Sequence, residues 1–160
     1  MKYSIYLLHV PINICRLECV ALLRSLKVNA VVIDFDQLCL KLPIQKVLGQ
    51  WIVNYFDKLR DSVCVPPLYL QWEGHSVTVI GYEQKQDNLS ILHFDPARNP
   101  SRILCALEIK TGWQKYVKRG IQTFKLDKYQ IVCILPNSAS YCSHEDKTIR
   151  GMKPTDDLPF

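Results

Sequence analysis

The sequence predicts an α/β (α+β) domain in which helices pack on a mainly antiparallel sheet. Residues 68–95 read as a short apolar strand followed by a β-hairpin. Residues 43–59 repeat apolar side chains at helical spacing over about four turns. A chain of 160 residues, with 48% hydrophobic and 22% charged residues, has the size and composition of one domain that can bury a core.

The first elements are read from residues 1–35. Residues 1–14 form a divergent N-terminal segment, in which an apolar run follows Lys2 but is interrupted by polar residues and a proline. No small-residue cleavage site follows, so we expect no signal peptide. Apolar residues at helical spacing then predict a helix over 15–27, and A-V-V-I-D-F predicts a buried strand over 30–35.

A second helix is predicted to begin at Pro43, a residue suited to a first helical turn. Its apolar residues fall on one face: Ile44, Val47, Leu48, Trp51, Ile52, Tyr55, Phe56 and Leu59. Polar residues occupy the opposite face. An aromatic stripe of this kind either packs in a core or binds a partner, and we interpret it as core.

The hairpin is predicted from alternation in Ser76–Gln84 and Leu89–Asp95, with polar turn residues at 85–88 between them. The shorter apolar run Leu68–Gln71 precedes it as a strand. Because an antiparallel return brings the start of one strand beside the end of the next, the residues that open and close this hairpin lie at the same end of the ribbon.

His75 opens the hairpin and Asp95 closes it. Opposed side chains at one end of a ribbon lie about 5 Å apart, so the carboxylate can reach the imidazole. A carboxylate bound to one ring nitrogen fixes the tautomer and leaves the other nitrogen as a general base. Gly74 permits a close approach of another backbone or a substrate, and Pro96 favours an extended Asp95. A purely structural pair is the alternative.

The C-terminal part is predicted to hold a helix over 101–119, or two short helices broken near Gly112, and a last buried strand over 129–135. Lysine and arginine are most frequent in this part of the chain, as a solvated face or as a surface for an acidic partner. Residues 137–160 have no apolar period and are predicted to be a mobile tail.

The composition and charge argue against several kinds of partner and ligand. The net charge of +5 is modest and aromatic residues are sparse among the basic ones, so we expect no direct binding of nucleic acid. No run reaches the length of about 18 apolar residues that a membrane span needs. Seven cysteines without a C-x-x-C pair argue against a zinc site and a disulfide framework. We expect no metal and no cofactor, mostly buried reduced thiols, and an intracellular location in cytoplasm or nucleus.

The run P-P-L-Y-L-Q-W-E-G-H-S-V-T-V-I-G, followed by L-H-F-D-P, carries a family resemblance. It resembles the pattern P-x-Y-x-Q-x-x-G-H-S-x-T-x-x-G, then L-D-P, of the zinc-finger-containing ubiquitin peptidases, which are papain-like cysteine peptidases related to the ubiquitin-fold-modifier-specific proteases. The segments E-C-V-A-L-L-R-S and G-W-Q-K-Y-V-K-R-G are similar to plant members.

The resemblance covers about Glu18 to Leu135, and it implies that 15–136 is the C-terminal half of a papain-like peptidase domain. It further implies that His75 is the general base and acid, that Asp95 orients it, and that ubiquitin or a ubiquitin-like modifier is the partner. Gln71 and Trp72 are expected near the cleft, without a defined role.

The nucleophile is the part that this resemblance does not supply. The family carries it in a C-G-Y-R-N segment, and nothing in this chain resembles that segment. Cys15 and Cys19 lie in the apolar stripe of a predicted helix, and Cys64 precedes two prolines instead of a helix, so none is favoured as a substitute. Three hypotheses follow: a truncated peptidase that is inactive alone, a non-catalytic ubiquitin-binding module, or an incomplete gene model of an active enzyme.

Overall fold

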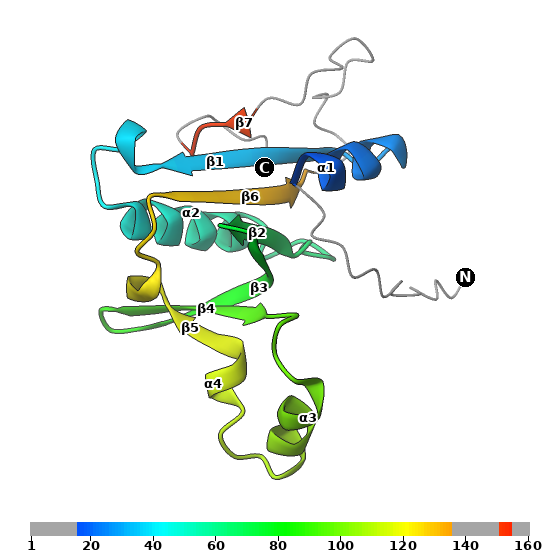
Figure 1. The fold of residues 1–160 in the computed structure, drawn as a ribbon, viewed down its shortest axis with the longest axis vertical. Coiled ribbons are helices and arrows are strands. Elements are labelled where there is room, and N and C mark those ends of the chain that lie inside the picture. Colours follow the sequence, from blue (N-terminus) through cyan, green and yellow to red (C-terminus); the bar gives the residue numbers. More distant parts are fainter. Residues whose placement is uncertain (1–15, 136–150, 155–160) are drawn as a thin grey trace.

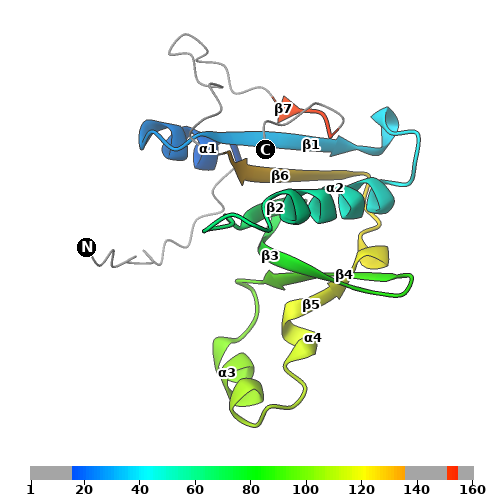
Figure 2. The same ribbon diagram turned by 180° about the vertical axis from the view of Figure 1, so that it is seen from behind.

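A computed structural model describes residues 16–135 and 151–154 of the chain. Figures 1 and 2 show one twisted sheet with helices against it. The elements are α1 (Arg16–Ser25), β1 (Ala30–Asp36), η1 (Gln37–Cys39), α2 (Ile44–Lys58), β2 (Leu68–Trp72), β3 (His75–Lys85), β4 (Asn88–Phe94), α3 (Pro100–Glu108), α4 (Gln114–Val117), β5 (Lys118–Gly120), η2 (Ile121–Thr123), β6 (Lys128–Ile134) and β7 (Gly151–Met152).

The seven strands form one sheet in the order β5-β4-β3-β2-β6-β1-β7. All neighbouring strands are antiparallel except β7, which pairs in parallel with β1. The mainly antiparallel sheet that the sequence predicts is therefore confirmed.

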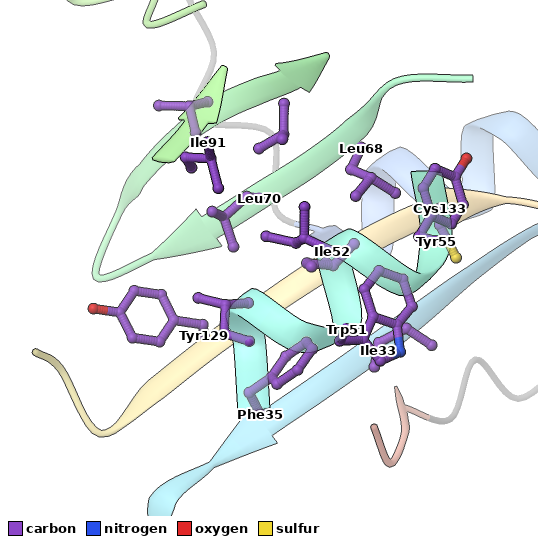
Figure 3. Close-up of a cluster of buried hydrophobic side chains, with 14 of the residues drawn as sticks. Ile33, Phe35, Trp51, Ile52, Tyr55, Leu68, Leu70, Ile91, Tyr129 and Cys133 are labelled. Carbon is purple, nitrogen blue, oxygen red and sulfur yellow. The ribbon is translucent and has the colours of Figure 1, made fainter. Parts of the chain in front are cut away.

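The larger core lies between α2 and one face of the sheet (Figure 3). The aromatic face of α2 points into this core, where the Trp51 and Tyr55 rings stack 5.8 Å apart. The Tyr55 hydroxyl donates a hydrogen bond to the carbonyl of Pro66 at 2.9 Å, which satisfies the polar end of a buried ring. Core packing, the interpretation chosen for this stripe, is confirmed.

The other face of the sheet is covered in part by α1. A smaller buried cluster joins Val20 of α1 to Ala30, Val32 and Val132 of the two strands beneath it. Successive residues of β1 thus enter the two cores in turn, as the period of a strand requires. This explains why A-V-V-I-D-F is a continuous apolar run.

The β3–β4 hairpin turns more tightly than predicted. Lys85 pairs with Asn88, so the turn holds two residues, of which Gln86 has a φ of 50°. The register shifts by one residue between Val79 and Gly81, and this bulge leaves Ile80 out of the pairing. The alternation on either side of the bulge keeps Val77 and Val79 in the core.

Two short strands were not predicted. Residues 118 and 119 were expected to end a helix, but Lys118–Gly120 forms β5 beside β4. Within the stretch predicted to be a mobile tail, Gly151–Met152 forms β7 beside β1. Strands of two or three residues carry too little periodicity to be seen in a sequence, because the neighbouring strand alone determines them. Of the two alternatives for residues 101–119, the structure shows two helices, and Gly112 lies between α3 and α4 with a φ of 70°.

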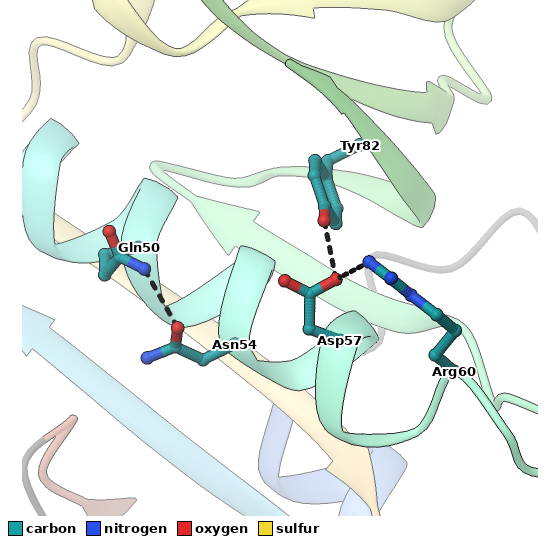
Figure 4. A network of polar contacts seen from close by, with 5 residues as sticks. All are labelled: Gln50, Asn54, Asp57, Arg60 and Tyr82. Atoms are coloured by element: carbon teal, nitrogen blue, oxygen red, sulfur yellow. Dashed lines mark hydrogen bonds and ion pairs between the residues drawn. The ribbon is translucent and has the colours of Figure 1, made fainter.

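A polar network joins the end of α2 to β3 (Figure 4). The carboxylate Oδ1 of Asp57 accepts hydrogen bonds from the Tyr82 hydroxyl and from Arg60, each at 2.6 Å. One turn earlier on the same helix, Gln50 donates to Asn54. None of the helices within the described residues is long and apolar enough to cross a membrane.

Removal of the Ile52 side chain tests the core. Ile52 is fully buried, and Ile52→Ala should lower the free energy of unfolding by about 2–5 kcal/mol, because the lost burial is accompanied by a cavity. Lys46→Ala, on the exposed face of the same helix, should change it by less than about 0.5 kcal/mol. Urea unfolding followed by circular dichroism measures both, and equal effects would contradict the packing.

The Asp57 network predicts a pH dependence. The hydrogen bond from Tyr82 and then the bond from Arg60 hold the pKa of Asp57 below its ordinary value. The stabilising effect of the ionised Asp57 carboxylate is therefore present above the ordinary carboxyl pKa. It is lost as the pH falls through the lower pKa that Asp57 has in the folded protein. Tyr82→Phe should raise the pKa of Asp57, as measured by carboxyl NMR titration, whereas Gln50→Ala should leave it unchanged.

Candidate active site

His75 is positioned by a tight turn between β2 and β3. Trp72 and His75 are the last pair of this hairpin, and the turn residues Glu73 and Gly74 both have positive φ, at 39° and 75°. That combination is typical of a type I′ turn. A Cβ at Gly74 would meet no described atom within 4 Å, so the expected close approach of another backbone is not observed. The glycine is required by the turn conformation instead.

Asp95 is brought to His75 by the pairing of β3 with β4. Thr78 pairs with Phe94, so the chain leaves β4 beside the start of β3. The Nε2 atom of His75 lies 3.4 Å from Oδ1 of Asp95. The structure thus joins the two residues that the sequence selected, and it leaves Nδ1 as the imidazole nitrogen that faces away from the carboxylate.

Asp95 is the more enclosed member of this pair. Its side chain is 12% exposed, whereas that of His75 is 35% exposed. Oδ1 accepts a hydrogen bond from the backbone N–H of Ala97 at 2.9 Å, and Oδ2 lies 3.5 Å from Nε of Arg98. A carboxylate held by the backbone and a cation has a fixed orientation, while the imidazole remains accessible to a third group.

A stack of aromatic rings forms one wall beside the imidazole. The Trp72 ring lies 4.8 Å from that of His75 and also contacts Phe124 and Tyr129, at 5.7 and 6.0 Å between ring centroids. The guanidinium of Arg119 lies over Trp72 at 4.9 Å and over Phe124 at 4.3 Å. These contacts restrict the freedom of Trp72, and through it the position of the His75 ring.

Gln71 and Trp72 line a hollow beside the site, as expected from the sequence. This hollow has a volume of 540 Å³ and reaches Gly74, next to His75. The Oε1 atom of Gln71 is buried and has no hydrogen-bond partner among the described residues. The other residues that line this hollow are Glu73, Lys125, Leu126, Asp127, Lys128 and Gln130.

The described cysteines do not complete the pair. No hydrogen bond joins His75 to any of the five thiols in the described part of the chain, all of which are free. Burial raises the pKa of Cys133 to about 12 and raises that of Cys19 as well, which disfavours the thiolate. Cys15 lies outside the described residues.

The expectation that most thiols are buried is wrong within the described segments. Cys39, Cys64 and Cys105 are exposed, and Cys19 is partly buried. Apolar sequence neighbours suggested burial, but Cys64 lies in a loop, and Cys39 and Cys105 lie in the short helices η1 and α3, where few residues are buried. Cys142 and His144 of the predicted tail are outside the described residues. Residues 16–135 and 151–154 contain no cluster of three or more histidine, cysteine or acidic side chains that could hold a metal ion.

His93 is a site residue that sequence analysis missed. It is 3% exposed, two residues before Asp95 on β4, and its Nδ1 has no described hydrogen-bond partner. Burial has the largest effect and lowers the pKa of His93. The charges of Arg119 and Arg98 lower this pKa further, whereas the charge of Asp95 and a hydrogen bond to the Val117 backbone raise it. In the run L-H-F-D-P, His93 and Asp95 are two residues apart, and alternate residues of a strand lie on the same face of the sheet. This spacing is the signal in the sequence that His93 lies near Asp95.

The chain is similar to a known peptidase family and to individual proteins from several organisms. Residues 13–132 match the model of a family described as Peptidase family C78. The chain is 35% identical over 127 residues to zinc finger-containing ubiquitin peptidase 1 of Homo sapiens, covering 73% of this chain and 22% of that protein. It is 32% identical over 115 residues to ubiquitin carboxyl-terminal hydrolase mug105 of Schizosaccharomyces pombe, covering 72% and 46%.

Among solved structures, the fold is similar to that of UfSP from C. elegans, with a TM-score of 0.57 and 16% identity. The match covers 77% of this chain and 22% of that one. At this identity the likeness concerns the fold, and it confirms the expected papain-like architecture. The chain spans 22% of the length of the zinc-finger-containing relatives that it matches.

The buried imidazole of His93 predicts a second pH dependence. A lowered pKa in the folded state means that the unfolded chain binds the proton more readily, so stability falls as the pH drops below the ordinary histidine value of about 6.5. His93→Gln should remove this part of the slope between about pH 6.5 and 5 in urea unfolding. An unchanged slope in His93→Gln would contradict the assignment.

Proposed function

This chain belongs to peptidase family C78, and on that premise we propose that it carries the base and the orienting carboxylate of a cysteine peptidase site. The bond to be cleaved is the one that joins ubiquitin or a ubiquitin-like modifier to another protein. The observation that carries the proposal is the His75–Asp95 pair, 3.4 Å apart, at the position of the family's G-H-S and D-P motifs.

The proposed mechanism assigns one step to each atom of the pair. Asp95 holds Nε2 of His75, which leaves Nδ1 to remove the proton from a thiol. The resulting thiolate attacks the carbonyl carbon of the scissile bond, and the imidazolium then donates its proton to the departing amine. Water, deprotonated by the same imidazole, finally releases the modifier from the thioester. The wall made by Trp72 limits rotation of the imidazole through these steps.

We assign the nucleophile to none of the five described cysteines. Cys133 and Cys19 are unsuited because burial raises their thiol pKa values. Cys64 is exposed, but it lies before Pro66 in a loop and has no helix N-terminus behind it to stabilise a thiolate or an oxyanion. In this proposal the attacking thiol reaches His75 from residues outside the described segments, or from a second polypeptide.

A second candidate function is a binding module for ubiquitin or a ubiquitin-like modifier that has no activity of its own. It is favoured by the lack of a hydrogen bond between His75 and any of the five described thiols. For either function, the five free cysteines are in keeping with the proposed location in cytoplasm or nucleus.

A covalent probe tests the proposal. The purified chain is incubated with ubiquitin bearing a C-terminal thiol-reactive group, and with the matching ubiquitin-fold modifier probe, and the intact mass is measured. If the nucleophile lies elsewhere, no adduct forms on the chain alone. If Cys15 or Cys142 does serve, an adduct forms, and His75→Ala should slow it by about 10²-fold or more because the base is lost. Asp95→Asn should slow it less.

Circular dichroism of each variant controls for folding. Binding of unmodified ubiquitin and of the ubiquitin-fold modifier, measured by calorimetry, separates the two functions. Binding without an adduct favours the module. An adduct that forms equally fast in His75→Ala overturns the proposed role of the pair, and the absence of both binding and adduct in folded protein overturns both candidate functions.

A further inference from the structure

His93 is a buried titratable side chain that the proposed mechanism does not use. It is 3% exposed, and its Nδ1 atom has no hydrogen-bond partner among the described residues. The imidazole does form a hydrogen bond to the backbone of Val117, which Nε2 makes by donating to the carbonyl. An apolar side chain of similar size would avoid the free-energy cost of a buried, unpaired nitrogen.

Strand pairing places His93 at the point where α4 becomes β5. Leu92 pairs with Lys118, so the next residue of β4, His93, lies at the level of Val117, the last residue of α4. Figure 1 shows this short helix leading directly into β5. β5 is an edge strand of three residues. The bond from His93 to Val117 therefore adds a side-chain contact at the beginning of a very short strand.

Arg119 lies two residues beyond Val117 and supports the candidate site. Its guanidinium lies 4.9 Å from the centre of the Trp72 ring and 4.3 Å from that of the Phe124 ring. The Trp72 ring in turn lies 4.8 Å from the imidazole of His75. The contact that holds the beginning of β5 thus also holds the cation that packs against Trp72.

Three charged groups act on His93. Arg119 on β5 and Arg98 in the loop after β4 would repel a protonated imidazole, whereas Asp95 would attract it. Strand β3, on the other side of β4, places the apolar Val79 opposite His93. Burial lowers the pKa of His93, so the imidazole is neutral in the folded protein at pH 7.

Protonation of His93 and local opening of the structure are linked. When the α4–β5 connection leaves His93, water reaches the imidazole and its pKa returns toward the ordinary value of 6.5. The open form then binds a proton more tightly than the closed form, so a falling pH favours opening. The imidazolium that forms repels Arg119 and attracts Asp95, the carboxylate that orients His75.

We propose that His93 is a positioning residue of the candidate site. Neutral His93 holds the α4–β5 connection through Val117 and keeps Arg119 over Trp72, whereas protonated His93 releases this support of His75. The inference rests on the proposed function, because it concerns the same imidazole. It predicts that the arrangement of the site is kept near pH 7 and is lost in mildly acidic solution.

Amide hydrogen exchange of the full chain, followed by NMR between pH 7.5 and 5.5, tests the release. The opening constant of the β5 amides that bond to β4, corrected for the intrinsic exchange rate, should rise by up to about tenfold over this range. At each pH it should exceed the opening constant of the β1–β6 amides by at least about tenfold, because the release is local.

Two variants separate the charge of His93 from its hydrogen bond. His93→Gln keeps a side-chain donor that does not titrate, so its β5 opening constant should stay within about twofold of the parent value at pH 7.5 over the whole range. His93→Leu loses the donor, so its β5 opening constant should be raised at least about fivefold at pH 7.5 and should not depend on pH.

Fluorine NMR of protein labelled with 5-fluorotryptophan follows Trp72, whose signal is identified by its absence in Trp72→Phe. Because His75 also contacts Trp72, the titration is made in His75→Gln, where His93 is the one histidine left among the described residues. The Trp72 signal of this variant should move between pH 7.5 and 5.5. It should not move when His93→Gln is added.

Three results would overturn the proposal. The first is an equal opening constant for the β5 and β1–β6 amides, which would mean that the chain opens only as a whole. The second is a pH dependence of β5 opening that persists in His93→Gln. The third is opening of β5 without movement of the Trp72 signal. These measurements use neither a thiol nor a modifier, so their outcome is independent of the covalent-probe experiment.

Discussion

Strand β3 pairs with β2 over residues 75–79 and with β4 over residues 78–85, and both the core and the candidate site depend on these two pairings. Its pairing with β2 puts Trp72 beside His75, and its pairing with β4 puts Asp95 there as well. The same strand contributes Val77 and Val79 to the core under α2. Because a shift of one residue would turn every side chain of β3 to the other face, packing of the core also fixes the register of the site.

The support of the imidazole comes from distant parts of the chain. Trp72 is held by Phe124 and Tyr129, which follow it by more than fifty residues, and by the guanidinium of Arg119 on β5. Rings and a cation packed together leave a side chain few rotamers, so packing within the chain fixes the position of the imidazole. The carboxylate, in contrast, is oriented by local groups, since Ala97 and Arg98 directly follow it.

Helices α2 and α3 show how similar sequence patterns reach different environments. Both repeat apolar residues at helical spacing, yet α2 buries its aromatic face against the sheet and α3 buries only Ala106. Helical period predicts a helix and its apolar face, but not what that face contacts, because the contact is made by residues far away in the chain. Cys105, on α3, is exposed for the same reason.

The sequence by itself determined the parts that rest on local pattern: α1, β1 and α2, the strands β2 to β4, and the proximity of His75 and Asp95. These follow from periodicity and turn chemistry, which act over a few residues. Only the tertiary structure decided β5 and β7, the ring stack around Trp72, the burial of His93 and the exposure of α3. Each of these depends on which distant segment lies alongside, and pairing and burial between distant segments leave no periodic trace in the residues themselves.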